Sequence, residues 1–156
     1  KGHPASAIRL LTGNGQRDFG ESRLQEALPK IELLKDLSQI RWHFIGRLQA
    51  NKVRKVIKSF TYIHSVDSFS LGERISRIAQ EENCCPNVML QIKFREDPSK
   101  GGFSLEDLLK TWPKLIRLSH LNIIGLMTIP PAHFDLQERM QVFVECPLKS
   151  VYLKLG

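Results

Sequence analysis

The stretch from Arg41 to Lys52 decides the fold and reads Arg-Trp-His-Phe-Ile-Gly-Arg-Leu-Gln-Ala-Asn-Lys. Its first part, Trp42 to Ile45, is rich in aromatic and β-branched residues and is typical of a short buried strand. Gly46 then lets the chain turn without steric cost. Further on, apolar side chains recur at the spacing of one helix face, at Val53, Val56, Ile57 and Phe60. The stretch therefore predicts a strand, a short loop and a helix over 51–60.

The same alternation of strand and helix patterns recurs along the chain. A first helix is predicted after Pro4, because proline suits the first turn of a helix. The predicted strands then cover 18–22, 42–45, 61–66, 87–94 and 121–129, and a helix follows each of them. Strict alternation with short loops predicts an α/β protein with a parallel sheet. A doubly wound sheet and a (β/α)8 barrel both fit this order.

Two helices carry local signals that the structure can test. Pro29 should kink or break the helix after the first strand, because proline removes a backbone hydrogen bond. Asp67 or Ser68 can cap the helix after the strand 61–66, but Ser70 with Glu73 forms the better capping box. We therefore predict a kink or a break near Pro29 and a helix start at Ser70.

The last two helices have clearer start signals. Ser104 is predicted to cap one of them, with Asp107 three residues on and an apolar face that reaches Ile116. Asp135 is predicted to cap a final helix that runs through Phe143. Together with the earlier segments, these signals predict one helix followed by five strand–helix repeats.

Length and composition describe one globular domain. The chain has 156 residues, 42% of them hydrophobic and 25% charged, so we expect residues 1–156 to form a single domain. No apolar run is long enough to span a membrane, and no signal peptide opens the chain. Three cysteines form no disulfide framework or metal motif, which favours a cytoplasmic setting. The net charge of +7 indicates an anionic ligand, a polyanionic partner or a solvated basic surface.

Candidate site residues are those that close the strands, because parallel strands end at one edge, where α/β proteins build their sites. These residues are Glu21, Ser22, Ile45, Gly46, Ser65, Asp67, Lys93, Phe94, Met127 and Thr128. They include no evident nucleophile–base pair, and the glycine-rich phosphate motifs are absent. His43 fits a core or a functional histidine equally, whereas His64 and Met127 are interpreted as structural. Phosphate contacts or a solvated helix face would explain the basic residues Lys52, Arg54, Lys55 and Lys58.

Six motifs, taken together and in order, resemble one protein family. They are Lys1-Gly-His-Pro4, Gly15-Gln-Arg-Asp-Phe-Gly-Glu-Ser22 with Gln25-Glu-Ala-Leu28, Trp42-His-Phe-Ile-Gly46 with Leu48-Gln-Ala-Asn-Lys52, His64-Ser-Val-Asp-Ser68, Ser99-Lys-Gly-Gly-Phe-Ser104 and Gly125-Leu-Met-Thr-Ile-Pro-Pro131. Each motif alone is weak, but six at compatible spacing are specific. From Lys1 to Pro131 the chain resembles the pyridoxal-phosphate homeostasis proteins, whose fold is similar to the barrel domain of alanine racemase.

The resemblance implies a (β/α)8 TIM-type barrel with pyridoxal 5′-phosphate at its mouth. The cofactor is expected as a Schiff base with a lysine that ends the first strand, and in register that lysine is Lys1. The resemblance also places Ser22, His43 and Met127 at the cofactor, although Ser22 stands where many relatives have asparagine. A lysine suits the role, because an unprotonated amine captures an aldehyde and desolvation readily lowers the pKa of a lysine.

The resemblance further implies that the barrel is incomplete. A complete barrel has about 250 residues, whereas this chain has 156. The strand that should carry Lys1 and the last two strands are apparently absent from the sequence. In the family those last strands carry the main phosphate contacts and the partner of the ring nitrogen, in a Ser-Met-Gly-Met-Ser and an Arg-x-Gly-Thr segment, and neither segment occurs here. We therefore expect weak cofactor binding and unpaired parallel edges.

Three functions compete. The first is a non-catalytic carrier of pyridoxal phosphate that supplies apo pyridoxal-phosphate enzymes. The second is an amino-acid racemase, which needs acid/base groups on both faces of a carbanion. In alanine racemase one of them is a tyrosine on an added domain that this chain lacks. The third, nucleic-acid binding, rests on charge alone. We expect the carrier, as a cytoplasmic monomer without a metal, nucleic-acid or membrane partner.

Overall fold

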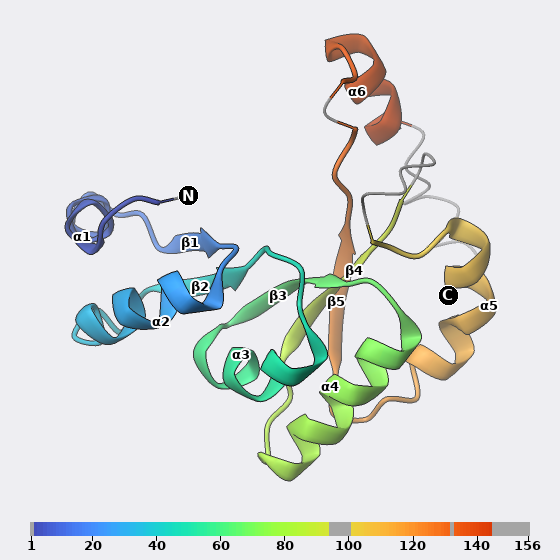
Figure 1. Ribbon diagram of the computed structural model, residues 1–156, viewed down its shortest axis with the longest axis horizontal. Helices are drawn as coiled ribbons and strands as arrows, with labels where there is room; N and C mark the ends of the chain where they lie inside the picture. The colour runs from blue at the N-terminus through green and yellow to red at the C-terminus, as the bar shows by residue number, and fades with distance from the viewer. Residues whose placement is uncertain (1, 94–100, 132, 145–156) are drawn as a thin grey trace.

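The computed structural model describes residues 2–93, 101–131 and 133–144. Five parallel strands form one sheet, and their order in space follows their order in the chain (Figure 1). The strands are β1 (Asp18–Glu21), β2 (Arg41–Phe44), β3 (Tyr62–Val66), β4 (Asn87–Gln91) and β5 (Asn122–Met127). A doubly wound sheet reverses its strand order at a switch point. The described strands do not, so of the two predicted architectures the structure favours an arc of a barrel.

The helices between the strands pack beside one another in the same order, while one further helix precedes β1 and another follows β5. They are α1 (Ala5–Gly13), α2 (Leu24–Leu33), the 3-10 turn η1 (Ala50–Lys52), α3 (Val53–Ser59), α4 (Phe69–Glu81), α5 (Leu105–Leu115) and α6 (Leu136–Val144). Contacts join α2 to α3, α3 to α4 and α4 to α5. The predicted strand–loop–helix unit of residues 41–60 is confirmed as β2, η1 and α3. None of the described helices is both long and apolar enough to cross a membrane.

The two faces of the sheet differ in polarity because alternate strand residues point in opposite directions. In β2, Trp42 and Phe44 are buried, whereas Arg41 is exposed and His43 is half-buried. Phe44 meets Phe60 edge to face, with the ring centroids 5.2 Å apart. The core lies between the sheet and the helices and includes Val53, Val56, Ile63, Ile75, Val88, Leu90 and Leu108. On β1 to β3 the opposite face of the sheet carries polar side chains, among them Asp18, His43 and His64.

The structure corrects two helix predictions. Residues 24–33 form one helix through Pro29, so of the predicted kink or break, the break does not occur. Pro29 and Gln25 are both exposed, so water can bond to the Gln25 carbonyl that lacks a donor. Helix α4 begins at Phe69, and its cap is Ser68, whose hydroxyl accepts a hydrogen bond from the Leu71 N–H at 3.4 Å. Ser70 already lies inside the first turn and cannot serve as the cap.

The later elements follow the sequence more closely. The Ser104 hydroxyl accepts from the Asp107 N–H at 3.0 Å, and the Asp135 carboxylate accepts from the Glu138 N–H at 2.8 Å, so both predicted caps are confirmed. The apolar face of α5 ends at the buried Leu115 instead of Ile116, which is 58% exposed. Leu115 lies two helical turns after Leu108 and so shares its face. Strands β4 and β5 are shorter than predicted, and Phe94 lies outside the described residues.

Candidate functional site at the carboxyl edge of the sheet

The loop after β1 and the loop after β2 come into very close contact at the carboxyl edge of the sheet. A Cβ atom placed on Gly46 would lie 1.9 Å from the carbonyl oxygen of Ser22. Gly46 is not among the described residues with positive φ, so the glycine is required by this approach and not by a left-handed turn. The Ser22 backbone is therefore held against the end of the neighbouring strand.

Glu21 closes β1, but its side chain points to the helix layer. Its carboxylate accepts a hydrogen bond from the ammonium group of Lys30 in α2 at 2.6 Å. The Glu21 and Lys30 side chains are only 8% and 14% exposed. Two buried opposite charges need each other, because a lone ion at such a site would be poorly solvated. Glu21 therefore has a structural partner and does not face the candidate site.

A chain of polar side chains crosses the opposite face of β1, β2 and β3. His43 bonds through Nε2 to the Asp18 Oδ1 at 2.9 Å and through Nδ1 to the His64 Nε2 at 2.9 Å. The other Asp18 oxygen accepts from the Arg41 guanidinium at 2.5 Å. Tyr62 stacks on the His43 ring with the ring centroids 4.5 Å apart. The side chains of Arg41, Asp18, His43 and His64 thus form one continuous hydrogen-bonded network, which we call the Asp18–His64 chain.

Electrostatics in this network favour a charged aspartate and a neutral His64. The hydrogen bonds from Arg41 and then His43 lower the pKa of Asp18 below its usual value. Burial, followed by the nearby His43, lowers the pKa of His64. The Asp18 carboxylate therefore stays ionised at neutral pH, and His64 resists a positive charge.

The predicted site residues lie on different parts of the sheet. Lys1 lies outside the described residues. Ser22 follows the first strand and Met127 ends the last, so they sit toward opposite margins of the described sheet. His43 pairs with Gly20 and so lies further from the carboxyl edge than Ser22. Both of its ring nitrogens are engaged in the Asp18–His64 chain. These assignments to a cofactor remain predictions.

Sequence reasoning missed Asp18 and Arg41 and did not link His43 to His64. The signal available in the sequence was the two-residue period of a strand. This period places Asp18 with Gly20, Arg41 with His43, and Tyr62 with His64 on one face. The missing information was the register. Gly20 lies beside His43, and His43 lies beside Tyr62. Only this alignment brings Asp18 and His64 within reach of the same imidazole.

Two of the basic residues considered for phosphate contacts have protein partners. Arg54 forms ion pairs with Glu81 and Glu82 at the end of α4, and Lys58 lies 2.5 Å from Glu82. These contacts fasten α3 to α4. The pairing favours a structural interpretation of Arg54 and Lys58 over phosphate binding.

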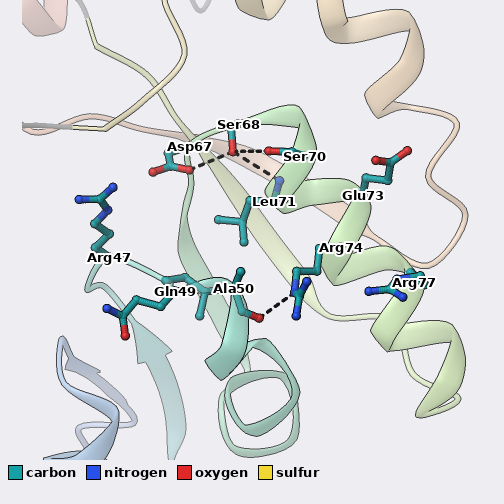
Figure 2. Close-up of a pocket in the computed structure, with 11 residues that line it drawn as sticks. Arg47, Gln49, Ala50, Asp67, Ser68, Ser70, Leu71, Glu73, Arg74 and Arg77 are labelled. Atoms are coloured by element: carbon teal, nitrogen blue, oxygen red, sulfur yellow. Dashed lines mark hydrogen bonds between the residues drawn. The ribbon is translucent and has the colours of Figure 1, made fainter.

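An open polar groove of about 970 Å³ lies between the loop after β2 and the start of α4 (Figure 2). Its charged side chains are Arg47, Asp67, Glu73, Arg74 and Arg77. One wall is fastened by Arg74, whose Nε–H donates to the carbonyl oxygen of Ala50 at 2.8 Å. The mixed charges of this groove select no single ligand.

The family model described as "Alanine racemase, N-terminal domain" matches residues 1–146. The chain belongs to the alanine racemase N-terminal domain family. The pyridoxal phosphate homeostasis protein of Synechocystis sp. is 51% identical over 138 residues, which cover 88% of this chain and 63% of that protein. The chain thus spans less than two thirds of the length of this relative. The resemblance to pyridoxal phosphate homeostasis proteins, predicted from six motifs, is confirmed.

Solved structures confirm the barrel fold class for this member of the alanine racemase N-terminal domain family. PipY of Synechococcus elongatus without pyridoxal phosphate is 42% identical, with a TM-score of 0.94 and coverage of 99% of this chain and 72% of PipY. PipY with pyridoxal phosphate bound is 41% identical, with a TM-score of 0.92 and the same 99% and 72% coverage. Alanine racemase of Clostridium difficile, 17% identical with a TM-score of 0.63 over 80% of this chain and 31% of the racemase, shares the fold.

Proposed function

We propose that the protein binds pyridoxal 5′-phosphate and acts as a non-catalytic carrier in cofactor homeostasis. The observation that carries the proposal is the likeness to PipY, which is 41% identical to this chain and has been solved with pyridoxal phosphate bound. The name of the Synechocystis relative points to the same role.

The cofactor-binding residues proposed are Lys1, Ser22, His43 and Met127. His3, two residues after Lys1, lines a cavity of about 170 Å³ between α1 and β1, where it lies with Ile8 of α1 and with Gly20 at the end of β1. The chain that follows Lys1 therefore passes the carboxyl end of β1, which is the edge where barrel proteins place their ligands. Ser22 and Met127 close strands at this same edge. These positions fit a cofactor held as a Schiff base by the ε-amine of Lys1.

A carrier role fits the described side chains better than a racemase role. Racemisation needs a second acid/base group on the far side of the substrate carbanion. Of the two tyrosines, Tyr62 is stacked on His43 within the sheet, and Tyr152 lies outside the described residues. When bound, pyridoxal phosphate supplies an electrophilic aldehyde, and the carrier needs only to hold and release it. We propose apo pyridoxal-phosphate enzymes as recipients, with a monomeric carrier in the cytoplasm.

The test is chemical trapping on the intact protein. We expect incubation with pyridoxal 5′-phosphate followed by borohydride to leave a stable adduct, and mass spectrometry of its peptides to place the adduct on Lys1. The Lys1→Ala variant should lose both the adduct and the visible absorbance of the bound cofactor. Lys55→Ala is the matched control, because Lys55 is exposed on α3 and has no partner among the described residues.

The outcomes separate the parts of the proposal. An adduct on another lysine would overturn the assignment of Lys1 and keep cofactor binding. The absence of any adduct would overturn the carrier itself. Loss of optical activity when the loaded protein is incubated with L-alanine would replace the carrier with a racemase.

A further inference from the structure

In the Asp18–His64 chain, one hydrogen bond joins the imidazoles of His43 and His64. Asp18, on β1, and His64, on β3, both bond to His43, which lies between them on β2. Each bond runs diagonally to a neighbouring strand, a distance that long or aromatic side chains can reach. We propose that the Asp18–His64 chain is a proton relay that switches the Nδ1 atom of His64 between hydrogen-bond acceptor and donor.

The acceptor state follows from the donors and acceptors available. The Asp18 carboxylate can only accept, so the Nε2 of His43 carries a proton toward it. In a neutral His43 the Nδ1 atom is then bare and accepts from the Nε2–H of His64. A neutral His64 with its proton on Nε2 has a bare Nδ1. Among the described residues this Nδ1 has no partner, and it is free to accept.

The donor state results from the arrival of one proton. The proton forms an N–H bond at the Nδ1 of His64, the Nε2–H bond of His64 breaks, and that proton forms a new bond at the Nδ1 of His43. His64 ends neutral, and its Nδ1 is now a hydrogen-bond donor instead of an acceptor. His43 ends as an imidazolium that donates to both Asp18 and His64, so the charge lies one ring away from the point of entry.

The surroundings place the charge on His43 and limit it to one proton. Asp18 faces His43 from β1, and Arg41 lies on the far side of Asp18. From β3, His43 meets the ring of Tyr62 and His64 itself. The alternate β4 residues Asn87, Met89 and Gln91 are uncharged. With two imidazolium rings, the His43 Nδ1 and the His64 Nε2 would both carry a proton at a separation of 2.9 Å, and the two charges would repel each other.

The relay is a property of this chain's own side chains and needs no cofactor, so it goes beyond the proposed function. His64 lies two residues further along β3, toward the carboxyl edge, than Tyr62, which pairs with His43. A ligand at that edge would therefore meet a nitrogen whose donor or acceptor character depends on pH. This role belongs to His64, for which the sequence had favoured a purely structural interpretation.

The relay can be tested by nitrogen-detected NMR of the histidine side chains in the intact protein, without cofactor, between pH 5 and 8. We expect the His43 Nε2 to carry a proton throughout. As the pair takes up its proton, the His43 Nδ1 and the His64 Nδ1 should become protonated together, and the His64 Nε2 should lose its proton. Independent titration of the two rings, or an uptake of two protons in this range, would overturn the relay.

Two variants sharpen the test. Asp18→Asn keeps an acceptor oxygen but removes the charge, so we expect the shared titration midpoint to fall by about one pH unit or more. His120→Gln is the matched control, because His120 bonds to Ser119 and lies outside the network, and it should leave the midpoint unchanged. If Asp18→Asn does not fold, the coupled protonation in the unaltered protein decides the question. An unchanged midpoint in folded Asp18→Asn would also overturn the proposal.

Discussion

The carbonyl oxygen of Ser22 lies where Gly46 leaves room for it and where no other residue would. A Cβ atom at residue 46 would sit 1.9 Å from this oxygen, 2.7 Å from the Ser22 carbonyl carbon and 2.8 Å from its Cα. All three are backbone atoms, which cannot rotate away as the end of a flexible side chain can. The loops that follow β1 and β2 are therefore locked together at the edge proposed to hold the cofactor.

Gly46→Ala should destabilise the protein by about 1–3 kcal/mol, the usual cost of overpacking, because the Ser22 loop must move. Chemical denaturation measures the change in the free energy of unfolding. Gly13→Ala is the matched control, since a Cβ there meets nothing within 4 Å. If the cofactor contacts Ser22, Gly46→Ala should also weaken pyridoxal phosphate binding. Equal stability of the two variants would contradict the close contact.

Lys30→Met should be costly because it leaves the Glu21 carboxylate buried without its partner. Breaking a buried pair on one side typically destabilises by about 3–5 kcal/mol. The double variant Glu21→Leu with Lys30→Met should recover most of the loss, because it removes the orphaned charge. Lys35→Met tests an exposed pair, with side chains 73% and 71% exposed, and should change little. A similar loss in both single variants would argue against burial as the cause.

Ser65→Ala should leave stability unchanged or increase it slightly. The Ser65 hydroxyl is buried, and its oxygen has no hydrogen-bond partner in the described part of the chain. Removing the hydroxyl therefore removes the free-energy cost of burying an unpaired polar group. Thr12→Val is the contrasting variant, because the Thr12 hydroxyl donates to the Ile8 carbonyl at 2.8 Å. That change should cost about 1 kcal/mol in thermal or chemical unfolding. A marked loss of stability in Ser65→Ala would show that the Ser65 hydroxyl has a hydrogen-bond partner.

Stability should fall as the pH drops below the usual histidine value of 6.5, because burial lowers the pKa of His64 in the folded protein. In that range the unfolded chain binds more protons than the folded one, so the free energy of unfolding decreases as the pH falls. Denaturation at pH 7 and pH 5 measures the loss. His64→Phe should reduce this pH dependence, whereas His120→Gln should retain it. An unchanged dependence in His64→Phe would assign the effect to other groups.

The helix boundaries show how far local patterns reach. The periodicity of 3.6 located α4 and its buried face of Leu71, Ile75 and Ile78 correctly, because that face repeats within one element. The choice between Ser68 and Ser70 as the cap depended on where the chain leaves β3, which periodicity does not encode. Pro29 was overestimated as a breaker for a similar reason, since its effect depends on whether the freed carbonyl meets water.

The sequence by itself determined the order of strands and helices, the parallel sheet and the family, because these follow from periodicity and from motifs read along one segment at a time. Only the tertiary structure decided that Glu21 turns to Lys30, that Ser22 abuts Gly46, and that hydrogen bonds join Asp18, His43 and His64. Such contacts join residues on different elements. They depend on the register between neighbouring strands, and this register is set by packing of the whole core instead of by any local pattern.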